Sequence, residues 1–188
     1  MSQSHQQYRP HQWERFSLTA PQAGRILADL RRGLGREAGD VPEMWTYYTT
    51  LNKEGYRTAA LKAEHAALSL FGLHQQSQRT PMHKAGVGLG DAALHLYLAA
   101  NANQTAIDGR MNMIATSTDS TELVGHLRGL VALLNEQAQP LDYTRLFLDL
   151  RFWDNPEKRP SIRRRWGGQY MDWRKRNPQA STSTDNNA

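Results

Sequence analysis

Apolar side chains recur along most of this chain at intervals of three and four residues, the spacing that places them on one face of an α-helix. No stretch of five or more residues alternates apolar and polar side chains in the way that indicates a strand. The sequence therefore predicts an all-α fold of about eight or nine helices, without a significant sheet. The helical pattern runs through residues 23–34, 59–78, 89–100, 107–115, 123–134, 143–153 and 162–173.

Capping residues precede several of these segments. Thr19–Gln22, Asp40–Glu43 and Asp119–Glu122 each have the form of a capping box, in which side chains satisfy the free amides of a helix start. Thr58 is placed to cap the segment 59–78, and Pro160 lies inside the last apolar pattern, which allows that helix to start only there. We expect helices to begin at all of these positions.

The order of the segments predicts two helical halves separated by the polar residues 101–104. We expect a loosely ordered N-terminal segment over 1–18, held by Trp13 and Phe16, and a disordered, polar tail over 176–188. Between them we expect an N-terminal helical domain over 19–101 and a C-terminal helical bundle over 105–175. The segment 59–78 is apolar around much of its circumference, which predicts that it forms the core of the first half.

The composition narrows the class of protein. The chain has 188 residues and no cysteine, which excludes disulfide frameworks, thiolate zinc sites and cysteine nucleophiles and fits a reducing compartment. No apolar run approaches the roughly 20 residues that cross a bilayer, and the N-terminus lacks the apolar core of a secretory signal. We therefore expect a cytoplasmic protein with no membrane partner.

The positive charge is concentrated near the C-terminus. Residues 158–176 hold eight cations and one acid. The net positive charge of this segment exceeds the net charge of +5 for the whole chain, so the remainder of the chain is slightly acidic. Arg163, Arg164 and Arg165 have no acid within three residues on either side, which favours phosphate contact over an ordinary solvated face. The aromatic stripe of the same segment predicts core packing in preference to base stacking; it comprises Ile162, Trp166, Tyr170 and Trp173.

A second basic stretch lies over residues 25–36. Helical spacing turns Ile26, Leu27 and Leu30 towards a core. The same spacing places Arg25, Arg32 and Arg36 on the opposite face of the helix. Arg31 lies at the flank of that face. The stretch contains no nucleophile, metal-ligand set or acid–base pair, so we interpret it as a basic edge for phosphates.

Catalytic and ligand motifs are absent from the sequence. The glycine-rich loop Lys84–Gly90 precedes a helix, but a P-loop requires its lysine after the glycines and a strand before them. We interpret this loop as a structural turn, with a backbone contact to phosphate left open. The seven histidines show no ligand spacing, and His74 is interpreted as a core histidine. We expect no metal site, no cofactor and no catalysis.

The succession of motifs resembles a known family. ADLRRGLGREAGDVPEMWTYY, LNKEGYRTAALKAEHAALSLFGLHQQSQ, MHKAGVGLG, HLRGLVALLNEQAQPLDYTRLFLDL and IRRRWGGQY occur in this order from about residue 20 to 172. Together they are similar to the CasB family, the small subunit of the type I-E CRISPR Cascade complex. The resemblance implies an all-helical, non-enzymatic protein of two small domains that works within an RNA-guided surveillance complex.

The resemblance also implies partners and contact residues. Two copies would pack head to tail beside the duplex of crRNA and target DNA, among the other Cascade subunits, and their basic surface would hold the displaced DNA strand of the R-loop. A separate nuclease-helicase would degrade the DNA. Asp91 departs from the family pattern and puts a phosphate path along the following helix in doubt. The basic positions carried over are Arg31, Arg32, Arg36, Lys84, Arg110, Arg128, Arg163, Arg164 and Arg165.

Two functions remain open at the level of sequence. The first is sequence-independent binding of nucleic acid through these cations, with affinity that falls steeply with salt. The second is a protein–protein scaffold, because arginine and aromatic residues are also favoured in subunit interfaces.

Overall fold

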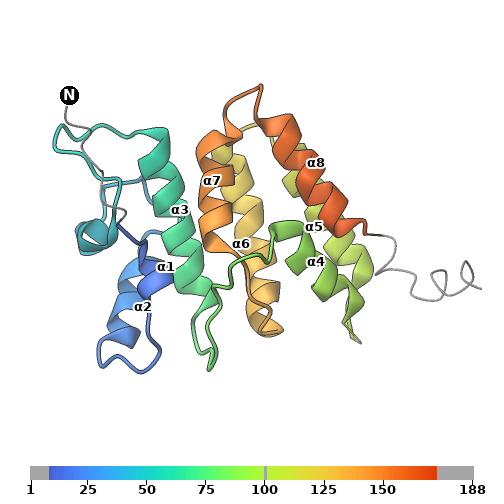
Figure 1. Ribbon diagram of the computed structural model, residues 1–188, viewed down its shortest axis with the longest axis horizontal. Helices are drawn as coiled ribbons and strands as arrows, with labels where there is room; N and C mark the ends of the chain where they lie inside the picture. Colours follow the sequence, from blue (N-terminus) through green and yellow to red (C-terminus); the bar gives the residue numbers. More distant parts are fainter. Residues whose placement is uncertain (1–8, 100, 173–188) are drawn as a thin grey trace, which may run out of the picture.

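The computed structural model describes residues 9–99 and 101–172, and the regular elements in these ranges are helices joined by loops (Figure 1). The all-α prediction is confirmed: within the described ranges the only β-type pairing is an isolated bridge between His83 and Leu141. None of these helices combines the length and apolarity needed to cross a bilayer. The helices are α1 Gln12–Arg15, α2 Ala23–Arg31, the 3-10 helix η1 Pro42–Tyr47, α3 Ala59–His74, α4 Leu89–Leu98, α5 Gln104–Thr116, α6 Ser120–Glu136, α7 Tyr143–Trp153 and α8 Arg159–Tyr170.

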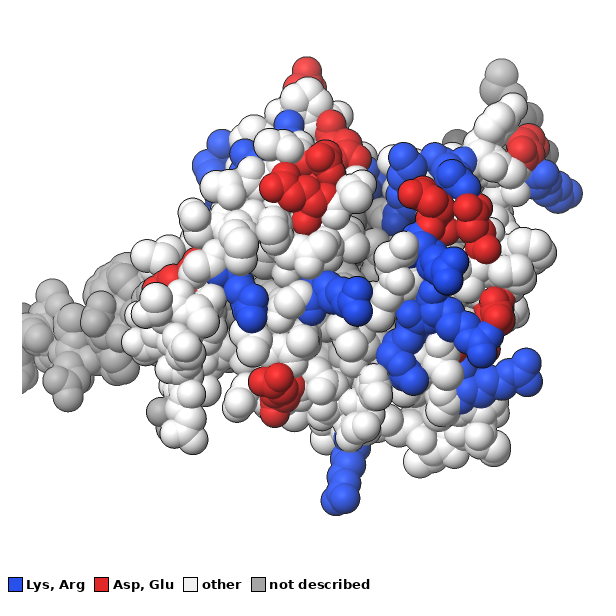
Figure 2. All heavy atoms as spheres, turned by 180° about the vertical axis from the view of Figure 1, so that it is seen from behind, with Lys and Arg blue, Asp and Glu red and all other residues white. Residues whose placement is uncertain are grey.

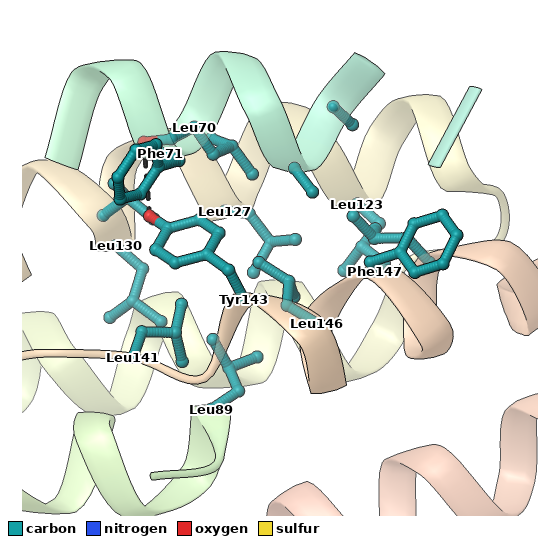
Figure 3. Packing of buried hydrophobic residues seen from close by; sticks show 14 of the residues in the cluster. Leu70, Phe71, Leu89, Leu123, Leu127, Leu130, Leu141, Tyr143, Leu146 and Phe147 are labelled. Atoms are coloured by element: carbon teal, nitrogen blue, oxygen red, sulfur yellow. Dashed lines mark hydrogen bonds between the residues drawn. The ribbon is translucent and has the colours of Figure 1, made fainter. Parts of the chain in front are cut away.

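Helix α3 is the centre of the packing. It lies against α2, α6 and α7 and is buried on nearly all sides, as its apolar circumference predicts. Figure 3 shows Leu70 and Phe71 of α3 facing Tyr143 of α7, whose hydroxyl donates a hydrogen bond of 3.2 Å to the backbone oxygen of Leu70. The helix ends at His74, earlier than the expected residue 78. His74 is fully buried, which confirms its interpretation as a core histidine.

Helices α4 and α8 pack side by side because glycine allows their close approach. A Cβ atom added at Gly90 would overlap the backbone oxygen of Trp166. Gly86, in the preceding loop, adopts a φ of +84°, which favours glycine. These constraints explain the glycine-rich loop as a structural turn. Ile162, Trp166 and Tyr170 are buried as predicted; Trp173 lies outside the described residues.

The contacts between helices cross the predicted boundary at residues 101–104. Helix α4 packs against α5, α6 and α8, while α3 packs against α6 and α7. The buried apolar side chains of both halves belong to one continuous cluster. The division into an N-terminal domain over 19–101 and a C-terminal bundle over 105–175 stays a prediction.

Two of the predicted capping boxes are wrong. Helix α2 begins at Ala23 with no side-chain cap, because residues 17–20 form a turn in which the hydroxyls of Thr19 and Ser17 are 3.1 Å apart. The residues after Asp40 form the 3-10 helix η1, again without a side-chain cap. The Asp40 carboxylate instead accepts a hydrogen bond of 2.6 Å from Arg57. A hydrogen bond between opposite charges is stronger than one from a backbone amide, so the carboxylate pairs with Arg57 and does not cap the helix.

The other helix starts are confirmed. The Thr58 hydroxyl accepts a hydrogen bond of 3.1 Å from the Leu61 amide at the start of α3. Asp119 accepts hydrogen bonds of 2.9 Å from the amides of Thr121 and Glu122 at the start of α6. Helix α8 begins at Arg159, so Pro160 occupies its first turn, where a missing amide proton costs nothing.

The N-terminal segment is more firmly held than predicted. Within the expected loose segment 1–18, Trp13 is 3% exposed and its indole donates to the Thr144 hydroxyl at 3.0 Å. The Glu64 carboxylate lies 2.7 Å from Nδ1 of His11 and accepts hydrogen bonds from Thr49 and Thr50. Burial alone would raise the pKa of Glu64, but these hydrogen bonds lower it overall. Residues 1–8 and the predicted tail over 176–188 lie outside the described residues.

Candidate nucleic-acid interface

A groove of about 510 Å³ lies between the turn that follows α2, the exposed side of α3 and the first half of α6. Its wall on α6 includes Thr121, Gly125 and Arg128, one helical face. Its wall on α3 includes Ala59, Lys62, Ala63 and Ala66, and the turn after α2 contributes Arg36. The groove therefore brings together Arg36 and Arg128, two predicted contact residues that are far apart in the sequence.

The turn after α2 is fixed to α3 by a buried histidine. The backbone oxygen of Gly33 lies 2.9 Å from Nε2 of His65, and because a carbonyl only accepts, the Nε2 proton is donated to it. The neutral ring then accepts at Nδ1 from the hydroxyl of Tyr48, at 2.7 Å. Burial lowers the pKa of His65 and raises the pKa of Tyr48 to about 12, so both groups stay neutral. This network holds Arg36 at the mouth of the groove.

The groove has an excess of available positive charge. Its two acids are engaged elsewhere: Glu37 lies 3.7 Å from Arg57, and Asp154 accepts from the amide and hydroxyl of Ser120 at 2.7 and 2.6 Å. Among the described residues, no acid lies within ion-pairing distance of the groove cations, which are Arg36, Lys62 and Arg128. The arrangement suits an anionic ligand.

The arginines of α2 and of the residue that follows it differ in their exposure and in their acidic partners, although their spacing predicted that all of them are available. Arg25 is 85% exposed and lies 3.8 Å from Asp29, one turn along the helix. Arg32 is paired with Glu43 of η1 in an exposed ion pair. A hydrogen bond from the backbone amide of Glu43 to its own carboxylate lowers the pKa of that carboxyl, and the hydrogen bond and charge of Arg32 lower it further. Arg31 is half-buried at the end of α2. The edge is therefore basic but interrupted by acids.

Arg110 and Lys84, two further predicted contact residues, lie outside the groove. Arg110 of α5 is half-buried against α6, where a Cβ atom at Gly129 would lie 3.4 Å from its Nη1 atom. Lys84 is exposed in the loop before α4, and its amide donates to the backbone oxygen of Leu141 at 3.1 Å. Neither residue lines the groove.

Two of the three consecutive arginines of α8 make contacts within the fold. Arg163 donates to the backbone oxygen of Ser117 at 2.5 Å and covers the ring of Trp153 at 5.4 Å. Arg165 pairs with Asp149 of α7, so the argument that this triplet lacks acidic partners is wrong for Arg165. Arg164 is exposed.

Asp149 is the buried partner that the sequence did not reveal. It is 5% exposed and also accepts a hydrogen bond of 2.8 Å from the indole of Trp166. Burial raises the pKa of its carboxyl, and the ion pair with Arg165 opposes that rise. The partner was missed because it is 16 residues distant in the sequence, on another helix.

The face opposite to the view of Figure 1 carries basic side chains in separate groups. Figure 2 shows the largest group over the side formed by the N-terminal third of the chain, with acidic side chains among it, and smaller basic patches towards the middle. Uncharged atoms separate these patches. The basic surface on this face is therefore a row of clusters, with no continuous stripe.

Lys62 is a cation of the groove that no sequence motif indicates. It is an exposed cation on helix α3, and the largely apolar pattern of that segment assigns the whole helix to the core. The available signal was the run of small residues around it, because Ala59, Ala63 and Ala66 at helical spacing leave room beside a helix. In the part of the chain that the structure describes, no three His, Asp or Glu side chains gather in a way that could hold a metal ion.

Comparisons with known proteins identify the family. Residues 26–171 match the family model described as CRISPR-associated protein Cse2. The crystal structure of CasB from Thermobifida fusca is 30% identical and superposes with a TM-score of 0.64, over 80% of this chain and 85% of that chain. The crystal structure of CasB from M. ruber is 22% identical, with a TM-score of 0.66 over 92% of this chain and 96% of that chain.

A third crystal structure, CasB from Thermus thermophilus, is 22% identical and superposes with a TM-score of 0.64 over 87% of this chain and 99% of that chain. No curated protein sequence matches the chain significantly. The family match spans α3 to α8 and most of α2. The chain therefore belongs to the CRISPR-associated Cse2 family, which includes the CasB proteins, and the resemblance inferred from its motifs is confirmed.

Proposed function

We propose that this protein is a non-catalytic small subunit of a type I-E Cascade complex that holds DNA by its phosphates and so stabilises the R-loop. The observation that carries the proposal is the groove between α3 and α6. There Arg36, Lys62 and Arg128 face the solvent without an acidic partner among the described residues. Membership of the CRISPR-associated Cse2 family supports the proposal that this positive charge serves a CRISPR complex.

Contacts of this kind bind without reading sequence. In an R-loop, base pairing between guide RNA and target DNA supplies the sequence specificity, and protein cations hold the strands through their backbones. We assign the displaced DNA strand to the groove, with Arg31, Arg32, Lys84, Arg110 and Arg164 as further contacts along its path. Arg163 and Arg165 serve the fold instead, because the groups they contact are internal.

The decisive experiment is the binding of fluorescent single-stranded DNA by the full chain, measured by anisotropy across a salt series. We expect the variant Arg36→Glu/Arg128→Glu to bind about tenfold more weakly or worse than the wild type at low salt. The slope of log affinity against log salt should also fall by about 1.4, because each cation that neutralises a phosphate of a single strand contributes about 0.7 to that slope.

A matched control is Arg145→Glu/Arg151→Glu, which makes the same change of charge at two exposed positions on α7. If this control weakens binding as much as the groove variant does, the effect is one of net charge, and the assignment of the groove is wrong. Absence of any salt-sensitive binding by the wild-type chain would contradict the proposed function itself.

Exposed apolar residues support a second role in subunit contacts. Trp45 and Tyr56 are 52% and 69% exposed on the segment before α3, and Leu148 and Phe152 are 42% and 41% exposed on α7. We assign these surfaces to other Cascade subunits and to a second, head-to-tail copy of the chain. Both roles can coexist, because none of the four residues lines the groove.

A further inference from the structure

We infer that the groove between α3 and α6 takes one unpaired nucleotide of the DNA strand, with the base inserted between the helices and its phosphates on the rim cations. This inference rests on the proposed function and names the unit that the groove recognises. It differs from binding by charge alone, because it requires a base as well as phosphates.

The floor of the groove is apolar and built from small side chains. Ala63 and Ala66 of α3 are 3% and 7% exposed, and Leu70 is fully buried beneath them. Val124 and Gly125 face them from α6. Small residues on both helices form an apolar floor below the polar and charged rim, and such a floor suits the faces of a base.

The polar groups at the bottom of the groove are already satisfied. Both ring nitrogens of His65 are hydrogen-bonded, one to Gly33 and one to Tyr48. The Ser69 hydroxyl donates to the backbone oxygen of His65 at 2.8 Å. With these groups paired internally, the floor offers mainly apolar contact. The occupant would therefore be held by shape and dispersion, without selection among the four bases.

The rim supplies the complementary charge. Arg36 comes from the turn after α2, Lys62 from α3 and Arg128 from α6, so the three cations approach the groove from different elements. The N-terminus of α6 adds nothing, because Asp119 and Asp154 already occupy its first amides. An occupant with an apolar, planar part and flanking anionic groups fits both features, and a nucleotide within a strand has this composition.

The size of the groove agrees with such an occupant. Pockets that bind small molecules usually have volumes of about 300 to 1,000 Å³, and this groove has about 510 Å³. A Cβ atom added at Gly125 would meet nothing within 4 Å, so the space beside α6 is open. A larger side chain at this position would therefore start in open space on the groove side of α6 and would remove no cation.

The test compares two strands of equal length and charge, oligothymidylate and an abasic deoxyribose-phosphate oligomer, by anisotropy with the full chain. We expect the wild type to bind the thymidylate strand about fivefold more tightly, because insertion of a base adds contact that charge does not supply. The groove-filling variant Gly125→Leu should bind both strands equally, with the affinity that the wild type has for the abasic strand.

The control Gly109→Leu places the same side chain on α5, where a Cβ atom also meets nothing within 4 Å, and should retain the preference. Ala59→Leu narrows the slot from α3 and keeps the test informative if Gly125→Leu fails to fold. If the wild type binds both strands equally, or if the filled variants keep the preference, the inference is overturned while the proposed function stands. If neither strand binds, the proposed function fails first.

Discussion

The two arginine-rich stretches of this chain have different roles in the structure. The C-terminal stretch is denser in charge, yet Arg163 and Arg165 contact Ser117, Trp153 and Asp149 within the fold. The stretch along α2 is sparser, yet it ends at Arg36, which lines a groove with no acidic partner among the described residues. The number of cations in each stretch therefore overestimated how many are available, and in the α2 stretch it is Arg36 that lines the groove without an acidic partner among the described residues.

The difference follows from what each stretch packs against. Helix α8 packs against α4 and α7, and its Arg163 and Arg165 are half-buried. A guanidinium that is half-buried there must find partners, because an unpaired buried charge is costly. The turn after α2 covers only one side of α3, and its cations extend into solvent. Variants in α8 and in the stretch along α2 can test this difference.

The largest effect is expected from Arg165→Ala. The substitution leaves the buried Asp149 carboxylate without its cation and should lower the free energy of unfolding by about 3 kcal/mol, measured by urea denaturation. The neighbouring variant Arg164→Ala removes an exposed side chain and should change stability by less than about 0.5 kcal/mol. Equal effects of the two variants would contradict the distinction between structural and available arginines on α8.

The next largest effect is the dependence of stability on pH that arises from His74, which lies at the end of α3, the helix that packs against α2. Burial lowers the pKa of His74 to about 4, from an ordinary value of 6.5. Below pH 6.5 the unfolded chain binds a proton that the folded chain does not, so stability is lost as pH falls from 6.5 towards 4. We expect a loss of about 2 kcal/mol between about pH 7 and pH 4.5 from this group.

Urea denaturation across this pH range measures that loss, and His74→Gln should flatten the curve. The matched control is His95→Gln, which makes the same substitution at an exposed histidine. Asp149, on the α8 side, acts in the opposite direction, because burial raises the pKa of its carboxyl. If the free energy of unfolding falls with pH as steeply in His74→Gln as in the wild type, groups other than His74 control the pH dependence.

The smallest effect is expected from Glu43→Gln. It releases Arg32 from an exposed ion pair and should strengthen binding of single-stranded DNA by about twofold, because the freed cation can contact phosphate. The midpoint of urea unfolding should not change, since exposed pairs contribute little to stability. Glu54→Gln removes the same charge at another exposed position. If this control has the same effect, the ion pair is irrelevant to binding.

Several features of the fold were determined by the sequence alone. The period of apolar residues specified the helices, because a side chain every three or four residues can be buried on one side only in a helix. Thr58, Asp119 and Pro160 marked helix starts correctly, since capping depends on residues that are close in the chain. The family resemblance also followed from local motifs and their order.

Only the tertiary structure decided which charges are available. Arg165 meets Asp149 and Arg32 meets Glu43 through contacts between different elements, which no helical spacing predicts. The same folding places Arg36, Lys62 and Arg128 around one groove. The availability of a charge depends on the groups that other elements bring within a few ångströms of it. Sequence determines how many charges there are, and packing decides which of them face a ligand.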